Sequence, residues 1–119
     1  MSDWTPPSYE HDYFVVHTFD VPNAQRTKHT DAHLVRIVPL IQQGIVKFAG
    51  ALLTPTSKTT DSDTLAKTAG SILIVRAKDL EQAWEIVKQD PFYASGEVWD
   101  HERTVVTPAF FAIPEVKFD

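Results

Sequence analysis

The sequence predicts an α+β domain in which two helices cover one face of a four-stranded antiparallel sheet. Four segments rich in β-branched and aromatic residues are expected to be strands. Two further segments repeat apolar residues at helical spacing, and each lies between strands. The resulting order, βαββαβ, is the ferredoxin-like arrangement. Because it leaves one face of the sheet uncovered, we expect a homodimer that buries residues 13–19 and 98–107.

The first half of the pattern begins with the aromatic strand Tyr13–Phe19. A helix is expected to start between Ala24 and Thr30 and to end at Gln43, followed by Gly44, which is typical of a helix end. Its apolar stripe is predicted from residues at three-residue spacing, widened by Leu34, Ile37 and Leu40; the stripe residues are Ala32, Val35, Val38 and Ile41. The second strand is expected at Ile45–Leu53.

The second half begins with a polar loop and continues with alternating strands and helices. Asp79 is expected to cap the second helix, and Pro91 follows the end of that helix. The nearly continuous apolar third strand is expected to be buried on both faces. The expected elements are the loop Thr54–Thr68, the strand Ser71–Ala77, the helix Leu80–Gln89, the turn Phe92–Gly96, the strand Val98–Thr107 and the extended tail Phe110–Phe118.

Length and composition are those of one globular domain. The chain has 119 residues, of which 43% are hydrophobic. Residues 1–10 are polar and contain Pro6-Pro7, so we expect a flexible lead-in before a single domain at 11–119. The net charge of −5 and the lack of a basic run argue against a nucleic-acid partner. No cysteine is present, which excludes disulfides and thiolate catalysis. Without a signal peptide or a long apolar run, we expect no membrane partner and a cytoplasmic location.

Five short motifs occur in a characteristic order. They are Ala32-His33-Leu34, Phe48-Ala49-Gly50-Ala51-Leu52, Ala69-Gly70-Ser71, Asp79-Leu80-Glu81-Gln82-Ala83 and Asp90-Pro91-Phe92. In this order and spacing the chain resembles the YCII-related family over roughly residues 13–111. The resemblance implies a dimeric α/β barrel, and some members resemble muconolactone-isomerase-type and dehydrochlorinase enzymes that act on small aromatic-derived acids. It also implies that His33 and Asp90 form an active-site dyad. The family's arginine is not immediately before His33, and Arg26 is the candidate for its role; the connection from Trp99 to Pro108 is also longer than usual.

The residue types at these positions suit acid–base chemistry. The imidazole of His33 can take or give a proton near neutral pH. A carboxylate such as that of Asp90 can fix the tautomer of the ring and raise the basicity of its other nitrogen. The structural alternative is that His33 packs against the helix and that Asp90 caps the turn at Pro91.

Three further residues are candidates for binding a substrate. Ser71 follows Gly70 at a strand start and can donate a hydrogen bond where the backbone allows close approach. Arg26 can hold an anionic group, and Phe92 can form a wall beside Asp90. The alternatives are an ordinary turn at Ser71, a solvated Arg26, and a Phe92 that anchors the turn.

His29 and His33 have the four-residue spacing of metal ligands on a helix. Asp31, His17 or His101 would have to supply a third ligand, and the glutamate of the zincin motif is missing. No dinucleotide or phosphate-binding glycine motif is present. We therefore expect neither a metal nor a cofactor.

These observations favour a small dimeric, cofactor-independent enzyme. His33, oriented by Asp90, would carry out proton abstraction, isomerisation or elimination on a small organic acid or lactone. The alternative is a non-catalytic dimeric module that binds a small molecule in the same cleft.

Overall fold

Four antiparallel strands form one sheet in the order β2-β3-β1-β4. The computed structural model describes residues 3–119. Its elements follow one another as β1 Tyr13–Phe19, α1 Arg26–Gln42, β2 Val46–Leu53, the 3-10 helix η1 Thr64–Lys67, β3 Thr68–Arg76, α2 Leu80–Lys88, α3 Pro91–Ala94, the 3-10 helix η2 His101–Arg103 and β4 Val105–Ala109. This order and pairing confirm the predicted ferredoxin-like α+β fold.

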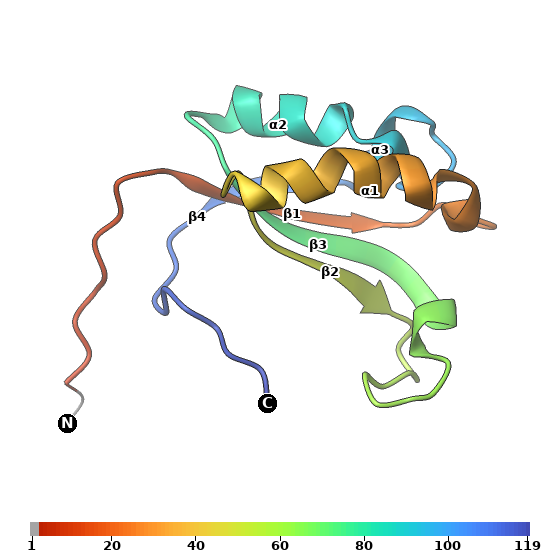
Figure 1. Cartoon of the computed structure of the whole chain (residues 1–119), viewed down its shortest axis with the longest axis horizontal. Helices are drawn as coiled ribbons and strands as arrows, with labels where there is room; N and C mark the ends of the chain where they lie inside the picture. Colours follow the sequence, from red (N-terminus) through yellow and green to blue (C-terminus); the bar gives the residue numbers. More distant parts are fainter. Residues whose placement is uncertain (1–2) are drawn as a thin grey trace.

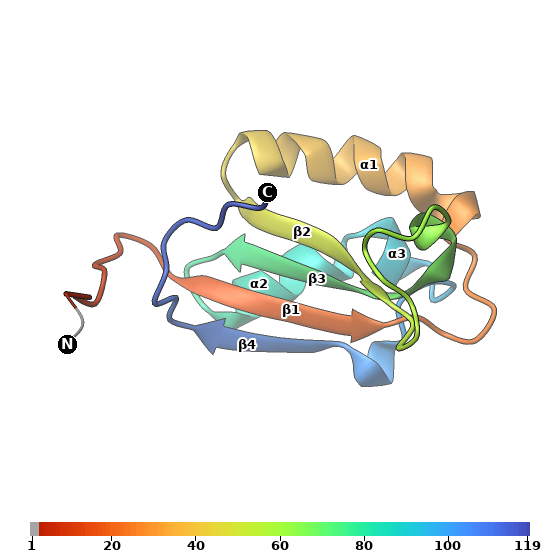
Figure 2. The same ribbon diagram turned by 90° about the horizontal axis from the view of Figure 1, so that it is seen from below.

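Helices α1, α2 and α3 lie on one face of the sheet, and in the described part of the chain none of these three covers the other face (Figure 1 and Figure 2). The alternation of side chains along β1 creates this division. Phe14, Val16 and Thr18 are at most 4% exposed and belong to the helix-covered side. Tyr13, Val15, His17 and Phe19 alternate with them and form the open side. We call this side of β1 the open face, together with the residues of β2, β3 and β4 whose side chains point to the same side of the sheet.

The predicted apolar stripe of the first helix is right at Ile37 and Leu40, which face the core, but wrong at the residues with three-residue spacing. Val35 is 77% exposed, and Val38 and Ile41 are also exposed. Residues three apart advance about 300° around a helix, so three such steps rotate by about 180° and leave the original face. The inward face instead uses mixed three- and four-residue spacing, and it includes the polar residues Arg26, Thr30 and His33 before Ile37 and Leu40.

The starts of the third and fourth strands differ most from the predicted strand boundaries. The third strand starts at Thr68 rather than Ser71, and the fourth starts at Val105 rather than Val98. Val98 and Trp99 are fully buried but irregular, because Val98 O accepts from Val21 N and Trp99 N donates to Phe92 O. The carboxylate of Asp100 then accepts from Glu102 N and turns the chain into η2. The third strand is buried on its helix-covered side, while Ile72 and Ile74 stay half-buried on the open face.

The two ends of the described chain run beside each other. Tyr9 Oη donates to Phe111 O at 2.6 Å, and Trp4 Nε1 donates to Ala112 O at 3.0 Å. Met1 and Ser2 of the expected lead-in lie outside the described residues. Within residues 3–119, no helix combines the length and the apolar character needed to cross a membrane.

Gly70 allows β3 to approach β1 closely, so Gly70→Ala is expected to destabilise the fold. A Cβ at this position would lie 2.2 Å from Thr18 O, a backbone atom that moves only if the strands separate. The expected loss is about 1–3 kcal/mol in the free energy of unfolding, measured by urea denaturation. Gly50→Ala is the matched control, because its Cβ would meet Ile72 Cγ2 at an ordinary 3.7 Å. Equal stability of the two variants would contradict the prediction.

Candidate functional site

Helix α1 and the start of α3 bring His33 and Asp90 into direct contact. His33 Nδ1 lies 2.8 Å from Asp90 Oδ1 and 2.9 Å from Asp90 Oδ2. Asp90 is also the N-cap of α3, and its Oδ1 accepts from Phe92 N at 2.9 Å. Pro91 at the first helical position gives no backbone N–H, which suits this turn. The same carboxylate therefore serves as a cap and as the partner of His33.

Neighbouring aromatic rings fix the orientation of the His33 imidazole. The ring stacks on Phe92 with centroids 4.0 Å apart and planes inclined by 4°, and it meets Trp99 edge-on at 6.2 Å. An ionised carboxylate can only accept, so a neutral His33 ring in this contact carries its proton on Nδ1 and has a lone pair on Nε2. In the described part of the chain, every buried side-chain polar atom has a partner. Nε2 has no protein partner there, so it is exposed rather than sealed in the core.

Arg26 lies about two turns before His33 on the inward face of α1 and is held by Asp20. Its Nη2 donates to Asp20 Oδ1 at 2.9 Å, to Gly70 O at 2.8 Å and to Ser71 Oγ at 3.0 Å. Its Nε also donates to Asp20 Oδ2, which makes the ion pair bidentate. The Asp20 side chain is 7% exposed, so this pair is largely shielded from water. The charge of Arg26 is therefore already balanced within the protein.

Ser71 receives two hydrogen bonds and has one left to give. Its Oγ accepts from Arg26 Nη2 and from Trp99 Nε1, each at 3.0 Å. A serine hydroxyl offers two lone pairs and one hydrogen. Because both lone pairs are taken, its hydrogen is available to an acceptor in the site. Trp99 is fully buried, so its indole N–H holds this arrangement from inside the core.

A cavity of 310 Å³ lies between α1 and the helix-covered side of β2 and β3. Four of the predicted residues line it: Arg26, His33, Ser71 and Phe92. Asp90 does not line the cavity and stands behind His33. The remaining wall is mainly apolar, formed by Leu34, Ile37, Val38, Ile41, Ala49, Leu73 and Trp99. This volume suits a small ligand with a few polar groups.

Sequence reasoning missed Asp20 and Trp99. The sequence pattern marks Asp20 only as part of a strand break, and Trp99 only as part of the fourth strand. Asp20 is six residues from its partner Arg26, but Trp99 is 28 residues from its partner Ser71. No local spacing therefore links the whole set. One usable signal was present, since a tryptophan that is buried in the core needs an acceptor for its N–H.

The other histidines are engaged at separate places. His29 Nε2 lies 2.8 Å from Glu97 Oε1, so it contacts a different carboxylate from that of His33. His17 is on the open face beside Phe19, and the ring of His101 stacks on Tyr93. Across residues 3–119, no group of three or more histidine, aspartate and glutamate side chains is arranged to hold a metal ion.

Glu97 ties the start of α1 to the segment after α3, and this contact is expected to depend on pH. Hydrogen bonds from His29 and then from Lys28 lower the pKa of Glu97. A lowered folded-state pKa stabilises the fold above the unfolded-state pKa, and this contribution is lost as pH falls through the folded-state pKa. Wild type should therefore exceed Glu97→Gln in Tm at neutral pH, and the difference should vanish in acid. Glu115→Gln is the control, since Glu115 forms no ion pair within the described residues. A Tm difference independent of pH would refute this account.

The fold and the site define a ferredoxin-like domain in which a histidine beside a small cavity is paired with a buried carboxylate. The model of the YCII-related domain matches residues 13–106, and the chain belongs to this family. The chain is also similar to the solved structure of 5-chloro-2-hydroxyhydroquinone dehydrochlorinase (TftG) from Burkholderia phenoliruptrix AC1100 in complex with 2,5-dihydroxybenzoquinone. That match has a TM-score of 0.64 and 26% identity, and it covers 79% of this chain and 89% of that chain. No curated protein matches significantly.

Proposed function

We propose that the protein is a small enzyme that performs acid–base chemistry on a small cyclic organic acid or lactone, with His33 as the general base. The observation that carries this proposal is the His33 imidazole, bonded through Nδ1 to buried Asp90 while Nε2 has no protein partner among residues 3–119. A positioned base of this kind contributes about 10²- to 10⁴-fold to a rate. The likeness to a dehydrochlorinase supports an elimination or a related reaction.

The reaction would begin with transfer of a substrate C–H proton next to a carbonyl to His33 Nε2. The electron pair of the broken bond moves onto the carbonyl oxygen. The resulting enolate oxygen accepts a hydrogen bond from the Ser71 hydroxyl group. The Asp90 carboxylate stabilises the imidazolium. In an isomerisation, His33 returns the proton to another carbon. In an elimination, the enolate electrons expel a leaving group from the adjacent carbon and form a double bond.

Arg26 would act chiefly by orienting Ser71 rather than by binding a free carboxylate. Its guanidinium is already bidentate to Asp20 and also bonded to Gly70 O and Ser71 Oγ. A second anion would have to compete with the shielded carboxylate of Asp20. The mainly apolar wall, including Phe92, favours the ring of the substrate. Ligands whose reacting end carries a carbonyl or hydroxyl should therefore bind better than those that place a carboxylate there.

Solvent exchange tests the proposed reaction even while its product is unidentified. The protein is incubated in D₂O with small lactones, cyclic keto acids and chlorinated hydroquinones, and each compound is followed by NMR. Incorporation of deuterium next to a carbonyl, or release of a leaving group, is expected for at least one class. Binding without exchange or turnover would instead favour the alternative, a non-catalytic small-molecule-binding module.

We also propose that two copies associate through the open face. Val15 and His17 lie on this face, Tyr13 packs there against Tyr9 and Phe111 of the terminal segments, and Phe19 and Val105 are 38% and 52% exposed. An apolar sheet face of this kind is rarely left in water. Sedimentation is expected to give a dimer that Val15→Glu dissociates, whereas the same change at Val35, exposed on the outer side of α1, should leave it intact. A monomeric wild type at micromolar concentration would refute the dimer.

A further inference from the structure

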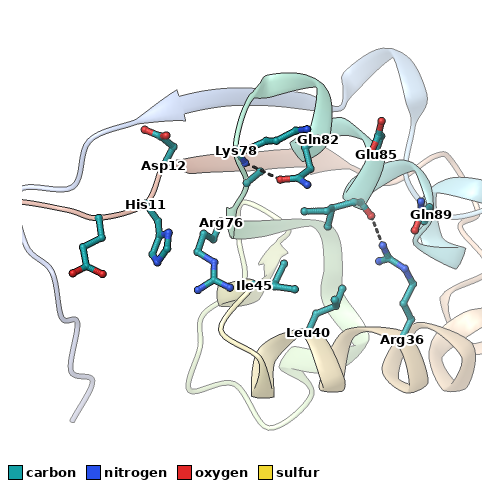
Figure 3. Close-up of a pocket in the computed structure, with 13 residues that line it drawn as sticks. His11, Asp12, Arg36, Leu40, Ile45, Arg76, Lys78, Gln82, Glu85 and Gln89 are labelled. Carbon is teal, nitrogen blue, oxygen red and sulfur yellow. Dashed lines mark hydrogen bonds between the residues drawn. The ribbon is translucent and has the colours of Figure 1, made fainter.

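Arg36 lies between the candidate site and a second cavity. It follows His33 by three residues on α1, so both side chains project from the same side of the helix. Its Nη2 donates to Ile86 O of α2 at 2.7 Å, and its Nη1 lies 3.7 Å from Asp90 Oδ2. Figure 3 shows the side chain extending from α1 toward α2 at the wall of a 580 Å³ cavity. Arg36 therefore approaches Asp90 from the side opposite the proposed substrate.

We propose that Arg36 is a positioning residue for the His33–Asp90 pair, and that its charge stabilises the ionised carboxylate and holds it oriented toward Nδ1. This inference rests on the proposed function of that pair. Asp90 is 2% exposed, and a buried carboxylate is unfavourable unless it is paired. Its other partners are the Phe92 N–H and the imidazole of His33, which is uncharged when it acts as a base. Within residues 3–119, no other lysine or arginine comes within 4.0 Å of Asp90.

The surroundings of Arg36 support an electrostatic role. Burial lowers the pKa of Arg36, while the charge of Asp90 raises it, so the guanidinium has lost water and interacts with the carboxylate. Its side chain is 22% exposed. The second cavity carries further charged side chains, namely Glu10, Asp12, Arg76, Lys78 and Glu85. Across the described chain, none of these forms an ion pair with Arg36. On the substrate side, Arg26 and Asp20 neutralise each other.

The competing explanation is that Arg36 only ties α1 to α2 through Ile86 O. The two roles differ in what happens to the proton equilibrium of the pair. Removing a nearby positive charge favours the protonated form of the pair, whether the proton sits on His33 or on Asp90. A purely structural role changes stability but leaves this equilibrium unchanged.

An NMR pH titration of the His33 ring tests the proposal without a substrate. In Arg36→Gln, the midpoint at which the pair takes up its next proton is expected to rise by about one pH unit. Arg36→Lys keeps the charge and should restore a midpoint near that of wild type. Arg76→Gln is the matched control, since it removes the same charge from the same cavity without contact to Asp90. An unchanged midpoint in folded Arg36→Gln, or an equal shift in Arg76→Gln, would overturn the proposal.

A second measurement keeps the proposal testable if Arg36→Gln does not fold. In Asp90→Asn, the guanidinium ¹⁵N signals of Arg36 are expected to shift, while those of Arg76 remain in place. No shift at Arg36 would show that the contact is not felt in solution. Once a substrate is known, the acidic limb of kcat/KM should move with the ring titration in Arg36→Gln. If the ring midpoint moves and no compound is turned over, the positioning role stands and the proposed reaction fails.

Discussion

Replacing His33 with glutamine is expected to lower kcat/KM by about 10²- to 10⁴-fold, the contribution of a positioned general base. Glutamine offers an amide N–H to Asp90, so the buried carboxylate keeps a donor, but it has no basic nitrogen for the cavity. The fold should therefore survive while proton abstraction is lost. The measurement is the rate of deuterium exchange or product release for a compound that the wild type processes.

The control for this prediction is His11→Gln. His11 is exposed and lines the second cavity, away from the substrate side of Asp90. The His11→Gln substitution removes an imidazole group but leaves the His33–Asp90 pair unchanged. Comparable losses in both variants would point to a general effect of histidine removal. Full activity in folded His33→Gln would remove His33 from the mechanism.

The fold could be predicted because its signals are local. The alternation along Tyr13–Phe19 and the Asp79 cap of the second helix are set by neighbours within a few residues, and both appear in the structure. The prediction of the apolar stripe on the first helix was partly incorrect for a local reason as well. Its inward side carries Arg26 and His33, which a hydrophobicity pattern cannot mark as inward.

The site could be predicted only in part, because its contacts are long-range. His33 and Asp90 are 57 residues apart, and their association came from the family resemblance rather than from spacing. Arg26 was expected to bind an anionic group of a substrate. In the structure its charge is already balanced by Asp20, six residues away. Trp99 donates to Ser71 only because the segment before β4 is irregular and buried. These contacts depend on how the strands and helices meet.

Replacing Asp90 with asparagine is expected to reduce kcat by about 10³- to 10⁴-fold while the protein stays folded. The asparagine carbonyl can still accept from Phe92 N and cap α3. Its amide N–H, however, would face His33 Nδ1 as a donor. The ring would then carry its proton on Nε2, so the nitrogen toward the cavity would donate instead of accept. In serine proteases the equivalent tautomer change costs about 10⁴-fold in kcat.

Asp90→Ala separates orientation from stability. Alanine removes the cap of α3 and leaves Phe92 N, His33 Nδ1 and Arg36 without their shared carboxylate. We expect a loss of about 3–5 kcal/mol in the free energy of unfolding, the range for breaking a buried ion pair from one side. Asparagine should lose much less, and the ¹⁵N signals of the His33 ring should report the changed tautomer. If Asn and Ala lose stability equally, the cap contributes little. If asparagine keeps wild-type kcat, the tautomer of His33 is not set by Asp90, and His33 would have to act without an oriented partner.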